Sequence, residues 1–364
     1  MAASPEPLPS SRCTWHMGRL RHGLVLLLAV ALGACGAPTV TARPSEAQGL
    51  GASPTVASTG SSSTARLVHA GGVPVVTGEP IDAADLTGRI LFDDFESVHA
   101  MDVDGSGVVT VASDPAGPEF DGAWSPDGEW VVYRDSTRGI NENDEIAIVR
   151  ADGTDRRFIA TDPANDWGPD WSPDGTTIAF NSDRGGGQIG GFLVNVDGSN
   201  LRPIPVPGWV EYPSFSPDGG RIAFMGHQGT DYEIFVADLT SGAVEKLTDA
   251  PADDGWPVWS PDGASIAFTS ERDDCRFQPL DQECWIDPEG DEHRDVWMIG
   301  ADGSNLRRVT SETGQFVAWS PDSRYLLVSG RELYVVRPDG TGRLELRAEG
   351  MDHALGGIPD WHPG

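Results

Sequence analysis

A five-residue motif, Trp-Ser-Pro-Asp-Gly, recurs along the chain and restricts the folds open to it. It stands at 124–128, 171–175 and 259–263, with a Phe variant at 215–219 and a variant ending in Ser at 319–323. The last four residues, Trp-His-Pro-Gly, are a shortened copy. Measured between the motif aromatics, the steps are 47, 44, 44, 60 and 42 residues. A period in the low forties is the length of one four-stranded propeller blade.

The residues around each motif predict the strands of such a blade. Ser-Pro-Asp-Gly suits a type I turn, because Pro presets φ at the second position and Gly is favoured at the fourth. An apolar triplet follows seven residues after each motif aromatic, and then a middle strand, a hairpin turn that is usually Asp-Gly, and a short outer strand. The triplets stand at 131–133, 178–180, 222–224, 266–268 and 326–328.

A further unit at the start of the repeats explains the shortened last copy. Apolar runs at 90–92, 98–101 and 108–111 lack a preceding Pro-x-Trp strand, and the chain end supplies one at 358–361. We therefore expect an all-β fold over residues 88–364. It is a six-bladed β-propeller of four-stranded blades, closed by the C-terminal strand pairing into the first blade. A closed ring is expected to be monomeric.

The first 35 residues resemble an export signal. Arg19 and Arg21 precede an uncharged run at 23–34, which is too short to span a bilayer but suits the core of a signal peptide. The run ends in Leu-Gly-Ala-Cys, which resembles the bacterial lipobox and implies lipidation of Cys35. The alternatives are an ordinary cleaved signal and an uncleaved anchor. We expect an exported protein that contacts the membrane through its lipid anchor, in the periplasm or at the cell surface.

Residues 36–87 are rich in Ala, Ser, Thr, Gly and Pro, and predict a disordered tether between the anchor and the ring.

Two cysteines remain in the exported part of the chain. Cys275 and Cys284 lie in the acidic insertion in the fifth blade, which widens the fourth step to 60 residues. In an oxidising compartment they predict one short-loop disulfide. A metal pair completed by His293 is the alternative, although zinc usually takes four ligands. The carboxylates of the insertion would suit Ca²⁺ or simply a solvated loop.

The charge balance limits the partners. The chain has 56 acidic and 25 basic residues, a net charge of −31. Such a surface repels phosphate backbones, so nucleic acid is not an expected partner, whereas basic peptides and cations are attracted.

The repeat itself resembles that of a known family. Trp-Ser-Pro-Asp-Gly followed by Ile-Ala-Phe at 259–268, and Asp-Gly-Ser-Asn-Leu-Arg-Arg-Val-Thr at 302–310, are similar to the TolB-type WD40-like propeller repeat. The resemblance covers the chain after the tether. It implies a periplasmic protein of an envelope complex whose channel mouth binds partner proteins and peptides. The chain departs from TolB in having a tether where TolB has an α/β domain, and in resembling a lipoprotein.

Ligands of a propeller usually meet the channel mouth, where the loops of all blades converge. Aromatic and acidic residues recur just before the Pro-x-Trp strands. We predict that they form an acidic, aromatic-lined mouth that binds a polar or basic peptide of a cell-envelope protein. The alternative is that the aromatics cap the core and the acids face water. The predicted binding residues are Trp167, Glu211, Tyr212, Asp254, Trp256, Phe316 and His353.

A lipid-anchored binding scaffold is therefore the predicted function, with no catalytic residue and no cofactor. The chain contains no Gly-x-Ser-x-Gly nucleophile elbow. The alternative is a propeller enzyme or a protein that binds metal or a small ligand in its channel, using His227, His353 or His362 with nearby carboxylates.

Overall fold

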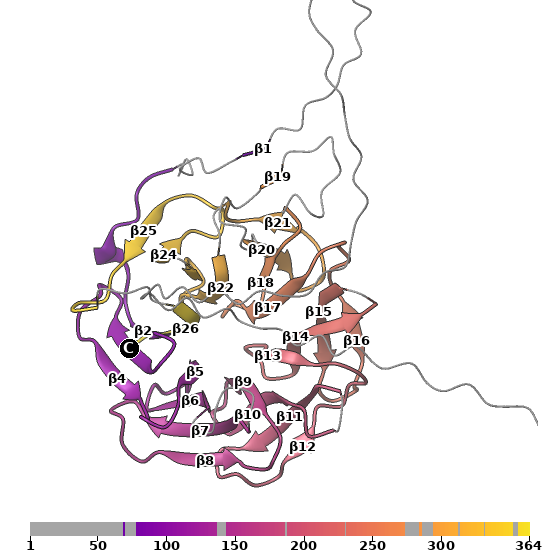
Figure 1. Cartoon of the computed structure of the whole chain (residues 1–364). Coiled ribbons are helices and arrows are strands. Elements are labelled where there is room, and N and C mark those ends of the chain that lie inside the picture. Colours follow the sequence, from indigo (N-terminus) through magenta and orange to yellow (C-terminus); the bar gives the residue numbers. More distant parts are fainter. Residues whose placement is uncertain are drawn as a thin grey trace, which may run out of the picture. The chain divides into compact units, whose positions relative to one another are not determined.

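The computed structural model describes residues 68–69, 78–136, 143–185, 188–229, 231–273, 284–285, 294–311, 314–330, 332–351 and 356–364. The predicted signal peptide, which includes Cys35, lies outside the described residues. Cys275 and His353 also lie outside them, and of Cys284 only the backbone is described. The described part contains six four-stranded antiparallel sheets arranged around a central axis (Figure 1). The predicted six-bladed propeller is confirmed.

Each blade runs from an inner strand beside the axis to a short outer strand. Blade 1 combines the last strand of the chain with the first strands of the ring: β26 (Gly356–His362), β2 (Arg89–Asp93), β3 (Val98–Asp102) and β4 (Val109–Ala112). Blade 2 is β5 (Glu119–Trp124), β6 (Trp130–Asp135), β7 (Glu145–Arg150) and β8 (Arg157–Ala160). Blade 3 is β9 (Asp166–Trp171), β10 (Thr177–Ser182), β11 (Gly190–Asn195) and β12 (Arg202–Pro203).

The remaining blades repeat this order. Blade 4 is β13 (Glu211–Phe215), β14 (Arg221–Gln228), β15 (Asp231–Asp238) and β16 (Val244–Lys246). Blade 5 is β17 (Asp254–Trp259), β18 (Ser265–Ser270), β20 (Asp295–Gly300) and β21 (Arg307–Arg308). Blade 6 is β22 (Gly314–Trp319), β23 (Leu326–Gly330), β24 (Leu333–Val336) and β25 (Arg343–Leu346). A separate parallel pair joins β1 (Val68–His69) to β19 (Cys284–Trp285), and η1 (Ala83–Asp85) is a 3₁₀ turn.

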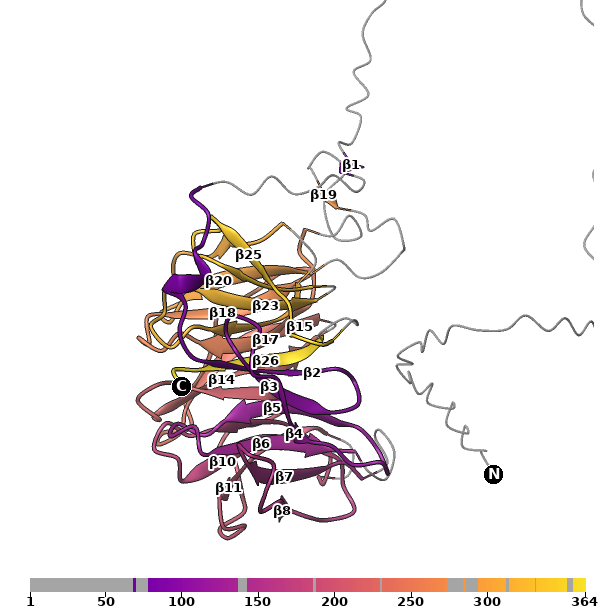
Figure 2. The same cartoon turned by 90° about the vertical axis from the view of Figure 1, so that its left-hand side faces the viewer.

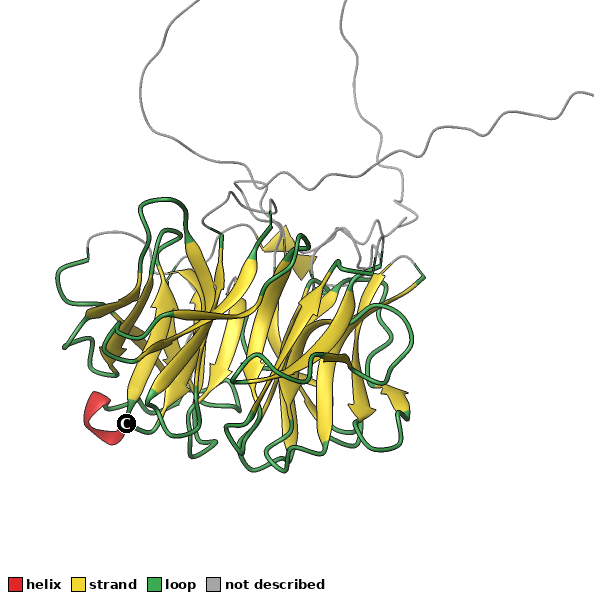
Figure 3. Ribbon diagram, turned by 90° about the horizontal axis from the view of Figure 1, so that it is seen from below, coloured by secondary structure: helices red, strands yellow, loops and turns green. Residues whose placement is uncertain are grey.

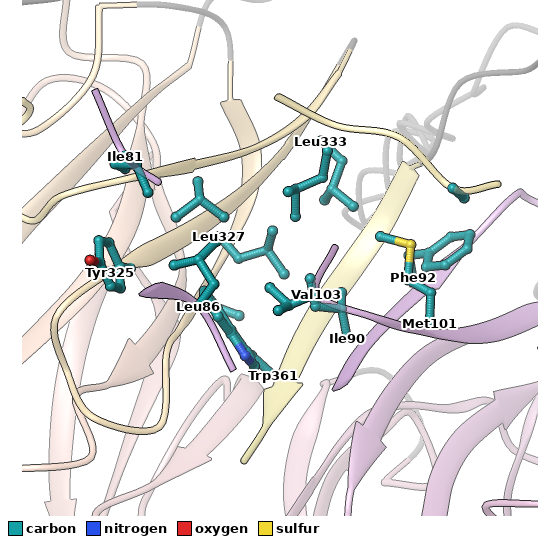
Figure 4. Packing of buried hydrophobic residues seen from close by; sticks show 14 residues of the cluster. Ile81, Leu86, Ile90, Phe92, Met101, Val103, Tyr325, Leu327, Leu333 and Trp361 are labelled. Atoms are coloured by element: carbon teal, nitrogen blue, oxygen red, sulfur yellow. The ribbon is translucent and has the colours of Figure 1, made fainter. Parts of the chain in front are cut away.

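The C-terminal strand closes the ring as expected. β26 lies beside β2 (Figure 2) and pairs antiparallel with it. Ile90 lies opposite Trp361, and Leu91 lies opposite Asp360. The Trp361 side chain is 5% exposed and packs with residues from blades 1 and 6 (Figure 4). Its indole Nε1 donates a hydrogen bond to the carbonyl of Thr87 at 2.9 Å. The strand that sequence analysis assigned to blade 1 therefore completes that sheet.

The motif builds the turn that its residues predict. In blade 2 the Gly128 amide donates to the Ser125 carbonyl at 2.8 Å. The Ser125 hydroxyl donates to Asp127 at 2.6 Å and accepts from the Trp130 amide at 2.9 Å. Gly128 has a φ of 69°, a left-handed conformation that glycine adopts without strain. The hydroxyl contacts recur in the other four motif turns, which fixes the hairpin between the first two strands of blades 2 to 6.

The folded part begins before the predicted boundary at Gly88. Residues 78–87 were assigned to the tether, but Ile81 and Leu86 are buried in the same cluster as Trp361 (Figure 4). The Arg337 guanidinium donates to the carbonyl of Glu79 at 2.8 Å. Two apolar residues in a polar segment give too weak a periodicity for sequence analysis to recognise. No helix in the described part of the chain is long and apolar enough to cross a membrane.

Candidate functional site

The inner strands all begin at the same face of the ring, which we call the mouth face. The Ser-Pro-Asp-Gly turns, η1 and the C-terminus lie at the opposite face, the turn face (Figure 3). The residue three positions before the motif aromatic is the second or third residue of each inner strand. We call these six residues the mouth ring. Its members are Asp121, Gly168, Tyr212, Trp256, Phe316 and Ile358.

A β-bulge sets the direction of the mouth-ring side chains. The pairing of the inner strand with the second strand shifts register beside Asp121, Tyr212 and Trp256. At these residues φ is 55°, 48° and 50°. Positive φ is a genuine outlier for a bulky side chain and costs about 1–3 kcal/mol. Bulges of this kind re-aim a side chain beside a binding site, and strained backbone persists where the surrounding structure holds it.

Three aromatic mouth-ring residues from consecutive blades contact one another. The rings of Tyr212 and Trp256 are 5.6 Å apart, and those of Trp256 and Phe316 meet edge to face at 5.3 Å. We call these three the aromatic arc. A Cβ on Gly168 would lie 2.9 Å from the Tyr212 ring, so the ring packs directly over the glycine backbone. The Arg294 guanidinium lies 4.9 Å from the centre of the Trp256 ring. The structure thus brings three of the predicted binding residues together.

Two carboxylates occupy the side of the mouth that belongs to blades 1 and 2. Asp93 is 1% exposed, and its Oδ2 has no hydrogen-bond partner in the described part of the chain. A Cβ on Gly357 would fall on that carboxylate, so glycine is required there. Burial, and then the charge of Asp121, raise the pKa of Asp93 to about 7. Burial also raises the pKa of Asp121. The carboxylates lack a full countercharge.

One arginine lies beside these carboxylates. Arg134 forms an ion pair with Asp144, and its guanidinium lies 5.6 Å from the Phe120 ring. The charges of Asp121 and Asp144 raise the pKa of Arg134 against the opposing effect of burial. The mouth is therefore apolar and aromatic along blades 4 to 6, and charged along blades 1 and 2. The sequence offered no signal for Asp93 or Arg134, because they lie on second strands rather than before the Pro-x-Trp strands.

Two predicted acids are buried at the start of their inner strands. Asp254 is fully buried and accepts from the Arg272 guanidinium at 2.5 Å. Burial raises the pKa of Asp254, and the Arg272 charge opposes that rise. Glu211 is also buried, and burial raises its pKa to about 7. Both carboxylates sit within the packing between strands, which limits their direct access to a ligand.

Trp167 does not join the aromatic arc. It lies four positions before its motif aromatic, opposite Asn181, whereas the arc residues lie three positions before theirs. Gly168 takes the mouth-ring position of that blade with a φ of 59°. Across the described residues, the Trp167 ring has no aromatic contact. In the sequence, the positions three and four residues before the motif aromatic look equivalent. In the structure, a shift of one residue at the bulge changes the direction in which the side chain points.

Deeper in the channel, two carboxylates connect adjacent blades. Asp360 accepts a hydrogen bond from the Trp124 amide, and Asp170 accepts one from the Phe215 amide, each at 2.7 Å. Burial raises the pKa of both groups, that of Asp170 to about 7. Within the described ranges, no group of three or more His, Cys, Asp or Glu side chains is arranged to hold a metal ion.

Sequence comparison gives short matches. The family model described as "TolB beta propeller domain" matches residues 204–276, in blades 4 and 5. An uncharacterized protein of Agrobacterium fabrum, Atu1656, is 36% identical over 102 residues, which are 27% of this chain and 33% of that protein. Dipeptidyl-peptidase 5 of Porphyromonas gingivalis is 39% identical over 67 residues, 18% of this chain and 10% of that enzyme. The chain thus spans a third or less of these relatives.

Structural comparison covers most of the ring. TolB from Acinetobacter baumannii has a TM-score of 0.61 and 20% identity, over 76% of this chain and 67% of that one. A putative TolB from Agrobacterium tumefaciens has a TM-score of 0.52 and 19% identity, over 71% and 87%. The tricorn protease has a TM-score of 0.55 and 19% identity, over 73% of this chain and 26% of its own. Such identities show the fold alone. The ring therefore has the fold of TolB-type six-bladed β-propellers, and its residues 204–276 match the TolB propeller model.

Proposed function

We propose that this protein is an exported, lipid-anchored scaffold whose channel mouth binds a protein or peptide of the cell envelope. The observation that carries the proposal is the aromatic arc, in which Tyr212 and Trp256 keep a left-handed backbone. A strained backbone at a half-buried aromatic pair favours a binding role over simple packing. Tyr and Trp are also the residues that most often anchor protein interfaces.

The charged side of the mouth favours a basic or polar partner. Burial and then the charge of Asp121 raise the pKa of Asp93, and burial raises the pKa of Asp121 even though the charge of Arg134 opposes that rise. A lysine or arginine of the partner would supply the missing charge, while an apolar side chain beside it would pack on the aromatic arc. Binding of such a peptide would release protons, since a nearby cation lowers carboxylate pKa values.

The comparisons and the sequence support an envelope location. The resemblance to TolB-type repeats implies a periplasmic location, and this ring has the fold of the TolB structures. The short apolar run before Cys35 has the composition of an export signal with a lipidation site. The low-complexity segment that follows would let the ring reach a partner away from the membrane.

Capture from a cross-linked membrane extract of the native cell tests the proposal. The full-length protein is compared with Tyr212→Ala, Trp256→Ala and the control Phe158→Ala, which truncates an outer-strand aromatic that is 46% exposed. We expect the wild type and the control to enrich the same envelope protein. Each mouth variant should lose at least about thirtyfold in capture, the lower limit for an interface hot spot. Equal capture by all four proteins would contradict binding at the mouth.

A further inference from the structure

A separate pocket of about 360 Å³ lies on the turn face, between blades 2 and 3. Its lining includes the buried apolar residues Ile148 and Trp171 and the half-buried Trp130. Asp127, Asp174 and Arg157 carry the charges along its lining. The volume is within the range of about 300–1,000 Å³ that small-ligand sites occupy. We call it the inter-blade pocket.

The sequence distinguishes this junction from the one that follows it. Trp130 begins β6, and the equivalent residue that begins β10 in the next blade is the much smaller Thr177. A Cβ on Gly175 would lie 3.8 Å from Cδ of Pro126 in the preceding turn, and the equivalent Cδ separations at the next two junctions are 3.6 and 3.8 Å. The spacing of the turns is thus similar, and the indole of Trp130 in the lining is what distinguishes this pocket.

The two aspartates present unused acceptors. Asp127 and Asp174 accept from Ser125 and Ser172 through Oδ1, at 2.6 and 2.7 Å. These hydrogen bonds lower the pKa of both carboxyls, so both are ionised at neutral pH. Neither Oδ2 atom accepts a hydrogen bond from a residue that the structure describes.

Arg157 supplies the opposite charge. Its guanidinium lies 4.9 Å from the centre of the Trp130 ring, and it has no ion pair within the described part of the chain. The second arginine on that ring, Arg150, is 4.6 Å from the centre and is paired with Asp155 at 3.0 Å. The charge of Arg157 contributes, after the hydrogen bonds from Ser199, to the lowered pKa of Asp197, which lies nearby but forms no ion pair with Arg157 among the described residues. The guanidinium can therefore also meet an anionic group that enters the pocket.

We propose that the inter-blade pocket binds a small zwitterion, either a free apolar α-amino acid or a dipeptide. Its ammonium group would bind Asp127 and Asp174, and its carboxylate would bind Arg157. Its side chain would pack against the lining residues Trp130, Ile148 and Trp171. A simple cation would leave the guanidinium unsatisfied, and a simple anion would be repelled by two carboxylates. This site lies on the face opposite the mouth, so it does not depend on the proposed scaffold function.

Fluorine NMR of the full-length protein labelled with fluorotryptophan tests the site directly. The Trp130 resonance is assigned as the one absent from Trp130→Thr, a variant that places the threonine of blade 3 in blade 2. L-Phenylalanine and L-alanyl-L-phenylalanine are expected to shift that resonance saturably. L-Phenylalanine amide, which is only cationic, and N-acetyl-L-phenylalanine, which is only anionic, should bind at least about tenfold more weakly, since each loses one charged hydrogen bond.

Calorimetry with variants supplies the second measurement. Arg157→Gln and Asp127→Asn should each weaken L-phenylalanine at least about tenfold. Asn keeps the oxygen that accepts from Ser125, so the turn is retained. Trp256→Ala at the mouth should bind L-phenylalanine like the wild type, and Trp130→Thr should still capture the envelope partner. The proposal is overturned if neither zwitterion shifts the Trp130 resonance, if the amide binds as tightly, or if Arg157→Gln has no effect.

Discussion

Trp361→Ala tests whether the last strand holds the ring together. The indole is 5% exposed, lies in the cluster between blades 1 and 6, and donates from Nε1 to Thr87 at 2.9 Å (Figure 4). Truncating a fully packed aromatic to Ala costs about 3–5 kcal/mol. Loss of the hydrogen bond should not raise the cost above that range, because the Thr87 carbonyl can bond to water once the cavity opens.

Trp319→Ala is the matched control. Trp319 has the same position in blade 6, is 7% exposed and donates from Nε1 to the Val258 carbonyl at 3.2 Å. Its strand lies inside the chain, so it is held at both ends. If β26 is a full member of the ring, the two variants should lower the free energy of unfolding by similar amounts. Urea unfolding followed by far-UV circular dichroism measures both. A loss below about 1 kcal/mol for Trp361→Ala alone, beside a full loss for Trp319→Ala, would refute closure by the C-terminal strand.

Two further predictions concern pH and the anchor. Burial raises the pKa values of Asp170 and Glu211 to about 7, above their unfolded values, so the folded state holds more protons between about pH 4 and 7 and stability falls as pH rises through that window. The urea midpoint should therefore be higher at pH 5.5 than at pH 8, and a midpoint that rises steadily over that range would contradict the assignment. Cys35→Ser should move the native protein from the membrane to the soluble fraction after cell lysis, and an unchanged membrane fraction would exclude lipidation at this residue.

The blade architecture could be predicted because the same motif and strand pattern recur several times along the sequence. Each Ser-Pro-Asp-Gly turn uses residues whose backbone and hydrogen-bonding preferences agree with the structure, and Ser125 and Gly128 make the expected contacts. Closure by residues 358–361 followed from counting strands. The inclusion of residues 78–87 in the fold could not be predicted in this way. Ile81 and Leu86 show no periodicity, and they are buried only by contacts from both ends of the chain.

The candidate site was predicted in part, for a local reason. Tyr212, Trp256 and Phe316 lie together because all three have the same offset from their motif aromatic. Trp167 lies four residues before its motif aromatic instead of three, and the position of a β-bulge cannot be predicted from the amino-acid sequence alone. Asp93 reaches the mouth through the pairing of β2 with β26, a contact between residues 263 positions or more apart in the chain. Such contacts leave no mark in a local pattern.

The six copies of the repeat allow one residue position to be compared within a single chain. The motif aromatic is Trp in five copies and Phe in one, as expected where every blade must fill the same space. The mouth ring instead carries Asp, Gly, Tyr, Trp, Phe and Ile, so the fold itself does not specify that position.

A purely structural role would favour glycine wherever the bulge requires positive φ, and Gly168 shows that glycine is accepted. Tyr212 and Trp256 take that conformation in adjacent blades, and the contact between their rings offsets only part of the cost of the strained backbone. Retention of a costly aromatic pair at the channel mouth is best explained by what the pair binds.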